Sequence, residues 1–269
     1  MNLPSTLTFD APAAALVRAV PDRFTDSIQE HPADIDVDRA RLQHAAYVSA
    51  LKEVGVAVRV LPALPDHPDC CFVEDPAVIL GRRALLTRSA APGRRGESAG
   101  VSEALADWCA LSAMPTPATL DGGDVLRIGQ TLYVGRTQRS NSEGLAWLKL
   151  AATAEGLTVR SVPLRAGLHL KSAVTLATPE LLIYCPSMLR PESLAEAGVE
   201  LLPTEEPHGG NVLALGDTIL VSAAAPRTAE ALHRRGLRVR VLQVDEFHKA
   251  DGALTCLSLR LPRAGTWTA

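Results

Sequence analysis

Long hydrophobic runs are absent from this sequence of 269 residues. Its longest apolar stretches, such as residues 11–17 and 76–80, fall far short of the ~20 residues that a helix needs to cross a bilayer, so we predict no membrane span. Residues 1–9 lack a basic segment followed by a sustained apolar one, which is the pattern of a secretory signal. We therefore expect a cytoplasmic protein.

Cysteine is also scarce, and neither sign of charge dominates. Five cysteines occur, and none of them follows a CxxC or zinc-finger spacing, which argues against a disulfide framework or a structural zinc site. A formal net charge of −3, from 27 Lys+Arg and 30 Asp+Glu, provides no broad attraction to nucleic acid or anionic membranes. The 47% of hydrophobic and 21% of charged residues are typical of a folded globular protein.

What the sequence does contain is an internal repeat. At five places small or polar residues precede a short apolar strand, and at four of these a turn and a second apolar strand follow. Turns at 81–83, 129–131, 178–180 and 216–218 mark the four expected hairpins. The equivalent points of the five units are spaced by 49, 48, 39 and 45 residues, and they are Asp75, Asp124, Ser172, Asn211 and Cys256.

A second element recurs between the hairpins: an amphipathic helix, a glycine suited to the helix end, and an alternating strand. The strands are expected within 53–62, 155–163, 197–203 and 235–242. The preceding helices are expected near 37–53, 141–155, 191–197 and 226–235. A further helix near 98–112 precedes an irregular, proline-containing connection.

Repeats of this size can stack into a solenoid or close into a ring. Solenoid repeats are usually more alike in sequence, whereas these units share a pattern but differ in their key polar residue. We therefore predict an α/β fold in which five units close around a central channel, as one domain over residues 1–269. The alternative is a βαβ sheet protein with unrelated turns.

Polar residues at the starts of the strands suggest one composite site. Grouped carboxylates favour a cation, and a planar guanidinium with five donors matches several carboxylates at once. A histidine and a cysteine facing such a cation would supply a proton carrier and a nucleophile. The residues concerned are Asp69, Glu74, Asp75, Asp121, Asp124, His169, Lys171, Asn211 and Cys256.

These residues also have simpler interpretations. A single cysteine near a C-terminus is often a small buried hydrophobe, although Cys256 follows a glycine turn and opens an alternating run. Asp121 and Asp124 flank two glycines and could form only a tight turn. The three arginines within 88–95 could form a solvated loop, or they could bind the carboxylate of a substrate.

In six motifs, spread over nearly the whole chain, the sequence resembles the dimethylarginine dimethylaminohydrolases. These enzymes are members of the guanidine-modifying (pentein) superfamily, which has a five-bladed β/α-propeller fold. The motifs are Pro-Asp-Cys-Cys-Phe-Val-Glu-Asp (68–75), Leu-Leu-Thr-Arg with Arg-Arg-Gly-Glu (within 85–97), Leu-Asp-Gly-Gly-Asp-Val-Leu (120–126), Gly-Arg-Thr-Gln-Arg-Ser-Asn (135–141), Gly-Leu-His-Leu-Lys-Ser (167–172) and Asp-Gly-Ala-Leu-Thr-Cys-Leu-Ser (251–258).

The resemblance implies a role for each catalytic candidate. Cys256 would be the nucleophile and His169 the general acid/base. Asp75 and Asp121 would hold the guanidinium, with support from Glu74.

It also implies how the rest of the substrate is bound. Asp69 would lie at the substrate site, Arg88 and Arg139 would pair with the amino acid carboxylate, and the backbone carbonyls of Ile28 and Ala250 would receive the α-ammonium. The resemblance implies no metal and no organic cofactor.

The function implied is hydrolysis of Nω-methylated L-arginine to L-citrulline and an alkylamine. The partner is thus a small molecule, and the sequence leaves open whether the protein is a homodimer. An arginine deiminase-like or other guanidine hydrolase is an alternative, but deiminases carry a carboxylate where this chain has Lys171. A non-catalytic binder of arginine-like ligands is another alternative, although a binder would need neither Cys256 nor His169. The turn at 208–211 departs from the usual family pattern.

Overall fold

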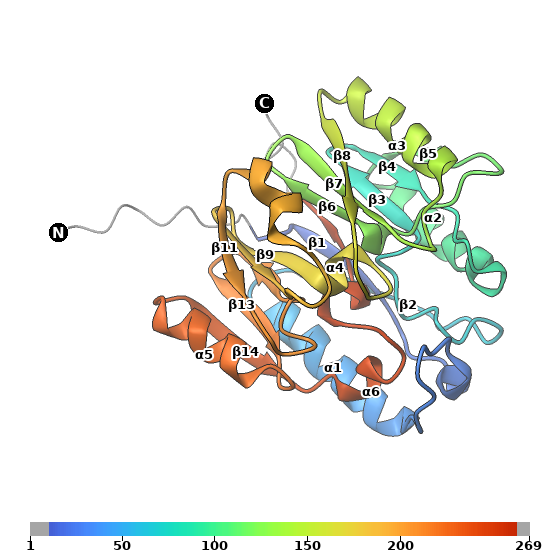
Figure 1. Cartoon of the computed structure of the whole chain (residues 1–269). Helices are drawn as coiled ribbons and strands as arrows, with labels where there is room; N and C mark the ends of the chain where they lie inside the picture. The colour runs from blue at the N-terminus through green and yellow to red at the C-terminus, as the bar shows by residue number, and fades with distance from the viewer. Residues whose placement is uncertain (1–10, 263–269) are drawn as a thin grey trace.

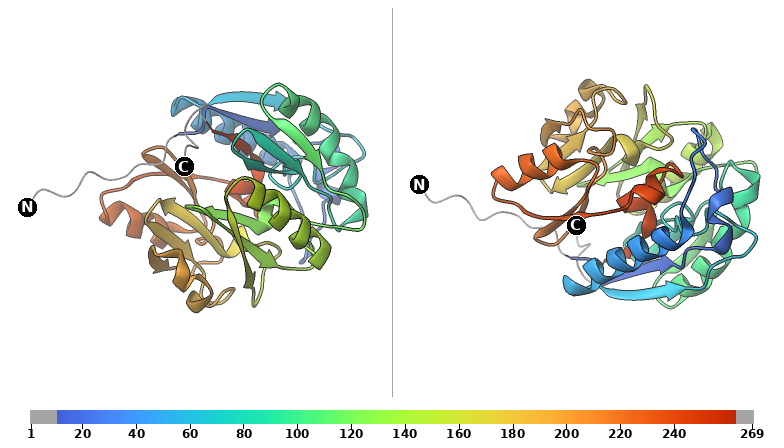
Figure 2. Two further views of the ribbon diagram at one scale, coloured as in Figure 1. Left: turned by 90° about the horizontal axis from the view of Figure 1, so that it is seen from above. Right: turned by 90° about the horizontal axis from the view of Figure 1, so that it is seen from below.

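Five three-stranded β-sheets are present in residues 11–262, the part of the chain that the computed structural model describes. In four of them an antiparallel hairpin is followed by a helix and by a third strand that runs parallel to the second one. The connecting helices lie on the outside of the sheets (Figures 1 and 2). This is an α/β fold, as predicted. Within residues 11–262 no helix has the length and apolar character needed to cross a membrane.

The four complete units follow one another along the chain. The first contains β3 (Ala77–Leu80), β4 (Arg83–Leu86), α2 (Ser98–Ala106) and β5 (Ala110–Ala113). The second contains β6 (Val125–Ile128), β7 (Thr131–Arg136), α3 (Ser142–Ala154) and β8 (Thr158–Pro163). The third contains β9 (Val174–Thr178), β10 (Leu181–Tyr184), the 3₁₀ helix η4 (Pro191–Ala197) and β11 (Glu200–Pro203). The fourth contains β12 (Leu213–Leu215), β13 (Thr218–Ser222), α5 (Pro226–Arg234) and β14 (Arg238–Leu242).

The fifth sheet is built from both ends of the described chain. β15 (Leu259–Leu261) pairs antiparallel with β1 (Ala14–Arg18), and β2 (Ala57–Leu61) returns parallel to β1 after α1 (Val37–Glu53). The fifth repeat thus takes its second strand from the N-terminal part of the chain. The predicted domain, residues 1–269, includes 1–10 and 263–269, which lie outside the described residues.

The four predicted hairpins are confirmed, and α1, α3 and α5 fall within about a residue of their predicted ranges. The helix predicted over 98–112 is too long, because α2 ends at Ala106 and β5 follows, parallel to β4. Three of the four residues of β5 are exposed, so this edge strand lacks the apolar alternation that marks a half-buried strand. Residues 191–197 form a 3₁₀ helix instead of an α-helix, since the segment between Pro191 and Gly198 is only about two turns long.

The largest hydrophobic cluster supports the segment that carries Cys256. Phe24, Phe72 and Phe247 meet in it, with ring centroids 5.4–6.3 Å apart, and Leu254 and Leu257 belong to the same cluster. Burial of each phenylalanine side chain stabilises the fold by about 1.5–3 kcal/mol. The flanks of Cys256 are therefore anchored in the core.

Candidate active site

Each unit carries polar residues in the segment that leads into its first strand. Asp75 precedes β3, and Asp121 precedes the 3₁₀ turn η3 (Gly122–Asp124) and β6. His169 precedes the short helix α4 (Leu170–Ala173) and β9, and Cys256 lies in the 3₁₀ turn η5 (Leu254–Leu257) before β15. The structure brings three of these side chains together: ligand atoms of Asp75, Asp121 and His169 all lie within 4.8 Å of one another.

Two glycines allow this close approach. The backbone N–H of Gly123 donates to Asp75 Oδ1 at 3.0 Å. A Cβ atom on Gly123 would lie 2.8 Å from both Asp75 Oδ1 and His169 Nδ1, and one on Gly122 would overlap the carbonyl of Glu74. The turn in the Asp-Gly-Gly-Asp motif is therefore tight because two polar side chains pack directly against its backbone.

His169 is buried between two carboxylates. Its Nε2 lies 3.1 Å from Asp121 Oδ2 and 3.9 Å from Asp75 Oδ1. Burial alone would lower the pKa of His169, but the charge of Asp75 and the hydrogen bond to Asp121 outweigh it and raise the pKa to about 9. The imidazole is therefore protonated at neutral pH. Without a ligand, these three residues form an ion-pair network, and a metal ion would have to displace the imidazole proton before it could bind there.

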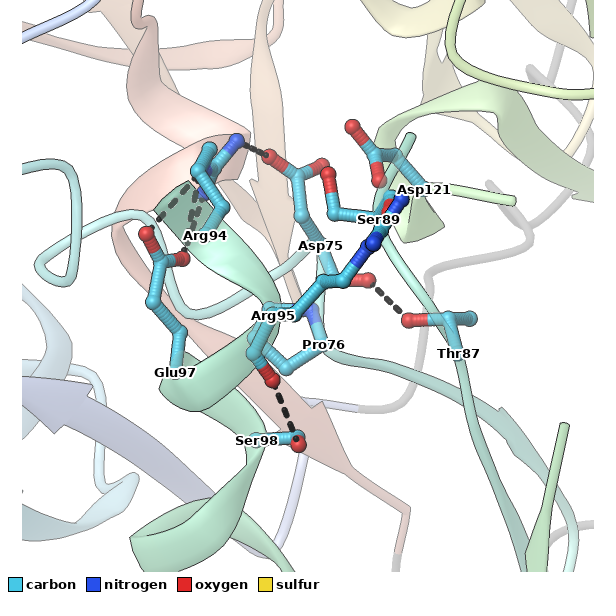
Figure 3. A pocket seen from close by; sticks show the side chains of 9 residues that line it. All are labelled: Asp75, Pro76, Thr87, Ser89, Arg94, Arg95, Glu97, Ser98 and Asp121. Carbon is cyan, nitrogen blue, oxygen red and sulfur yellow. Dashed lines mark hydrogen bonds and ion pairs between the residues drawn. The ribbon is translucent and has the colours of Figure 1, made fainter. Parts of the chain in front are cut away.

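Asp75 is held ionised from two sides. Arg94 Nη1 donates to Asp75 Oδ2 at 2.8 Å, and Arg94 is itself bound by Glu97, whose Oε2 lies 2.8 Å from Nη2 (Figure 3). Burial would raise the pKa of Asp75, but the charges of His169 and Arg94 lower it to about 2. All of these side chains are buried, and Asp75 carries a negative charge at every physiological pH.

Asp124 has a different task from Asp121. It is buried, and its carboxylate accepts hydrogen bonds from Thr137 Oγ1, Ser140 Oγ and the backbone N–H of Leu170, the last at 3.0 Å. Since Leu170 follows His169 directly, Asp124 fixes the segment that presents the histidine. It belongs to the scaffold of the site.

The two arginines that the resemblance implied for carboxylate binding lie in different surroundings. Arg139 is buried, with its Nη1 3.8 Å from Asp121 Oδ2 and without a hydrogen-bond partner among residues 11–262. Arg88 is half-buried, and its backbone forms an isolated antiparallel β-bridge with Leu120. Within the described chain its side chain makes no hydrogen bond or ion pair. Arg94, from the same basic segment, is the arginine that contacts the carboxylates of the site.

Asp69 and the N-terminal loop meet beside these arginines. Asp69 is buried, and its carboxylate accepts the backbone N–H of Ile28 at 3.2 Å. Burial raises the pKa of Asp69, while the charges of Arg94 and Arg139 lower it. Ala250 lies in the turn before Asp251, whose Oδ2 accepts the backbone N–H of Glu30 at 2.5 Å. The segments that contain Ile28 and Ala250 are thus neighbours, far apart as they are in the sequence.

Glu74 faces a different partner set from Asp75. Its Oε1 accepts hydrogen bonds from Lys171 Nζ at 2.6 Å and from Arg260 Nη2 at 2.5 Å. Its backbone N–H donates to the carbonyl of Cys256 at 3.2 Å. The sequence did not single out Arg260, although a charged residue inside an otherwise apolar strand could have drawn attention to it.

Cys256 is buried, and its thiol is neutral in the free protein. Burial raises its pKa to about 12, and the charges of Glu74 and Asp75 act in the same direction. The thiolate therefore needs a nearby cation before it can form in quantity at neutral pH. A cationic ligand placed beside Asp75 would provide one.

The turn at 208–211, which departs from the usual family pattern, lines a cavity next to the site. His208 stacks on His248 with ring centroids 3.7 Å apart. Both imidazoles face a cavity of about 300 Å³, whose wall also includes Leu168 and Ala253, next to the segments of His169 and Cys256. Asn211 donates to the Thr255 hydroxyl at 2.9 Å and so braces the nucleophile segment from this side.

The raised pKa of His169 predicts a specific pH dependence of stability. Its folded pKa of about 9 exceeds the reference value of 6.5, so the stabilisation is complete below about pH 6.5 and is lost as the pH rises through 9. The expected loss is up to about 3 kcal/mol of the free energy of unfolding. Urea denaturation between pH 6 and 10 measures it.

The control for this measurement is His169→Gln. Other groups, Cys256 included, titrate in both proteins, so the difference between the two curves isolates His169. The variant should lose less stability than the wild type over this interval. Parallel curves would show that His169 is not protonated in the folded protein.

Comparisons of the sequence and of the structure with known proteins all find similarity to one family. A family model described as "N,N dimethylarginine dimethylhydrolase, eukaryotic" matches residues 4–206. The N(G),N(G)-dimethylarginine dimethylaminohydrolase of Streptomyces coelicolor is 40% identical, over 92% of this chain and 96% of the relative. That of Pseudomonas aeruginosa is 30% identical, over 90% and 95%. The structure of the Pseudomonas aeruginosa enzyme, a cysteine-to-serine mutant complexed with citrulline, superimposes with a TM-score of 0.87 at 28% identity, over 93% of this chain and 100% of that one.

Proposed function

Because the chain belongs to the dimethylarginine dimethylaminohydrolase family of the pentein superfamily, it is a hydrolase acting on C–N bonds of linear amidines, and we propose that it converts Nω-methylated L-arginine to L-citrulline and an alkylamine. The substrates proposed are asymmetric dimethylarginine and monomethylarginine. The observation that carries this proposal is the convergence of His169, Asp75 and Asp121 beside the segment of Cys256.

The first half of the proposed reaction forms a covalent intermediate. The guanidinium binds against Asp75 and Asp121, and its charge lowers the pKa of the Cys256 thiol, which releases its proton to the solvent. The thiolate adds to the guanidinium carbon. His169, protonated in the resting protein, gives its proton to the departing nitrogen, the C–N bond breaks, and an S-alkylthiouronium remains on Cys256.

The second half restores the enzyme. His169 is now neutral and takes a proton from water as the oxygen adds to the thiouronium carbon. The C–S bond breaks, Cys256 leaves as the thiolate, and the protonated product gives its proton to this thiolate, which restores the thiol and releases citrulline. The carboxylate of Asp121, at 3.1 Å, keeps the imidazole oriented through both halves.

Substrate orientation is proposed to come from the arginines and the N-terminal loop. The Nη1 of Arg139, which lies 3.8 Å from Asp121 and makes no hydrogen bond among residues 11–262, is available to the substrate carboxylate. Arg94, which is bound to Asp75, would share this task. Arg88, which the resemblance implied, remains a candidate. The carbonyls of Ile28 and Ala250 remain candidates for the α-ammonium.

We further propose that the five sheets close into a five-bladed β/α-propeller, with the active site in its central channel, and that the whole chain is one catalytic domain. The pairing of β15 with β1 supports closure, because it puts the two ends of the repeat array into one sheet. The cytoplasmic location and the small-molecule substrate as the partner stay predictions. The sequence allows a homodimer, and this also stays a prediction.

The expected substrate preference is for methylated arginines over arginine. The position two residues after His169, where deiminases carry a carboxylate, is occupied by Lys171, which is bound to Glu74 at 2.6 Å. A lysine in this position removes one acceptor for an unsubstituted guanidinium nitrogen. Each missing charged hydrogen bond costs about 1.5–3 kcal/mol, so we expect kcat/KM for arginine to be at least ~10-fold lower.

Citrulline formation from asymmetric dimethylarginine, monomethylarginine and arginine measures this preference. Initial rates are compared at equal enzyme concentration, with a Cys256→Ser preparation as the blank. Arginine as the preferred substrate would favour the deiminase-like alternative. No turnover of any of the three would favour a binding protein.

A further inference from the structure

A buried ion cluster joins the two segments that carry His169 and Cys256. The Glu74 side chain is only 2% exposed and receives two cations on one oxygen: Lys171, from the segment of His169, and Arg260, from the strand that follows Cys256. The other oxygen, Oε2, has no hydrogen-bond partner among residues 11–262. Burying a carboxylate with two cations costs desolvation free energy. Such a cluster is therefore expected where it fixes the position of a segment or sets the local charge.

Arg260 also holds the turn that presents the nucleophile. Its Nη1 donates to the backbone carbonyl of Thr255 at 3.0 Å and to that of Ser258 at 2.8 Å, the residues on either side of Cys256 and Leu257. The hydroxyl of Ser258 lies 2.7 Å from the buried hydroxyl of Tyr47 on α1. One planar guanidinium therefore spans the nucleophile turn and Glu74, which a single ammonium could not do.

The charges in the cluster act on the thiol. Among the charged groups, Glu74 opposes formation of the Cys256 thiolate most strongly, ahead of Asp75, and Lys171 acts in the opposite direction. Arg260 binds the same oxygen of Glu74 as Lys171, at 2.5 Å, and offsets its charge. Removing Arg260 would leave more negative charge beside the sulfur and would also release the turn.

Arg260 does not line the pocket beside Asp75 and Arg94 or the cavity beside His208. Its effect on the reaction must therefore pass through Glu74 and the nucleophile turn. We propose that Arg260 is a positioning residue, which fixes the Cys256 turn against Glu74 and offsets the charge of Glu74 so that the thiolate can form. The kinetic part of this proposal rests on the proposed function, whereas the part that concerns the thiol does not.

Alkylation of Cys256 by iodoacetamide in the absence of substrate provides the test, with labelling of the Cys256 peptide followed by mass spectrometry at several pH values. Below its pKa a thiol reacts about tenfold faster for each pH unit, because the thiolate fraction rises tenfold. A change in the pKa therefore shifts the labelling rate by the same factor at every pH in this range. We expect Arg260→Gln to slow labelling about 3- to 10-fold at every pH. We expect Glu74→Gln in the Arg260→Gln background to restore it to within ~2-fold of the wild type.

A matched control is Arg83→Gln, which breaks a solvent-accessible arginine–glutamate pair with Glu155, 2.9 Å long, and should leave labelling unchanged. The direction of the effect is decisive. Release of the buried turn alone would accelerate labelling, whereas the uncompensated charge of Glu74 slows it. The proposal requires the charge effect to dominate, so an unchanged or faster rate in Arg260→Gln overturns it. Failure of the double variant to recover also overturns it.

Steady-state kinetics give the second measurement. We expect Arg260→Gln to lower kcat about 10-fold with KM within ~3-fold, because Arg260 does not contact the substrate. A rise in KM at constant kcat overturns the positioning role. If methylarginines are not turned over at all but Arg260→Gln slows labelling, the proposed function fails and the positioning of the thiol stands.

Arg260→Lys keeps the test open if Arg260→Gln does not fold, as judged by circular dichroism. It retains the positive charge but loses the planar fork. We expect labelling within ~2-fold of the wild type and kcat lowered about 3- to 10-fold. A Lys variant with wild-type kcat overturns the proposal.

Discussion

Replacing Cys256 by Ser is expected to reduce citrulline formation from methylated arginine by at least ~10⁴-fold while the protein still folds. A hydroxyl is a far weaker acid than a thiol, and the site already raises the pKa of the thiol to about 12. The charge of a bound guanidinium is enough to promote deprotonation of the thiol, but it is not enough to deprotonate a serine hydroxyl. The rate of citrulline release, measured with enzyme at high concentration over hours, gives the size of the loss.

The fold should tolerate this change because serine is close to cysteine in size and the side chain is 8% exposed at the end of a 3₁₀ turn. We expect a change in unfolding free energy of about 1 kcal/mol or less. The variant should still bind methylarginine in an equilibrium titration, since Asp75, Asp121 and Arg139 are untouched.

The matched control is Cys109→Ser, a cysteine that is only partly buried and lies between α2 and β5. It should keep full activity. Appreciable turnover by Cys256→Ser, with Cys109→Ser at wild-type rate, would contradict nucleophilic catalysis by Cys256.

The repeat could be predicted from the sequence because each unit is local. Hairpin turns, amphipathic helices and the glycines after them lie within about 45 residues of one another, so patterning alone locates them. β5 was missed since its residues are exposed and carry no alternation. The partner of β15 was missed for a different reason: β1 lies about 240 residues earlier in the chain, and no local signal specifies a pairing over that distance.

The side-chain partners in the site were less predictable than the site itself. The starts of the strands indicated Asp75, which is one of the equivalent points of the repeat, and also Asp121 and His169, which lie three residues before the equivalent points Asp124 and Ser172. Nothing in the sequence tells which of several arginines in one loop will turn inward, and Arg94 does so while Arg88 stays half-buried. That choice depends on Glu97, which holds Arg94 from the far side and is set by the fold of the whole loop.

Glu74 illustrates the same limit. It neighbours Asp75 in the turn that precedes β3, but the two side chains have different partners. Asp75 faces His169, and Glu74 faces Lys171 and Arg260. These cations could not be predicted from the sequence, because they come from two other units.

The second large effect is expected for His169→Gln. Glutamine can still accept a hydrogen bond but cannot carry a proton, so both the protonation of the leaving nitrogen and the activation of water are lost. We expect kcat to fall about 10³-fold or more. Any thiouronium that forms should persist, because its hydrolysis also needs the imidazole, and intact-mass spectrometry after an acid quench should show the adduct on Cys256.

The pH dependence distinguishes a proton carrier from a structural residue. Since His169 donates the proton in the first half of the proposed reaction and its pKa is about 9, the wild-type rate should fall as the pH rises through about 9. Asp121→Asn retains the imidazole but removes a negative charge 3.1 Å away that raises the pKa of His169, and it leaves only a neutral amide oxygen as acceptor. In Asp121→Asn the fall of the rate at alkaline pH should therefore occur about one pH unit lower than in the wild type. A fall at the same pH as in the wild type, or a His169→Gln variant within ~10-fold of the wild type, would show that another group carries the proton.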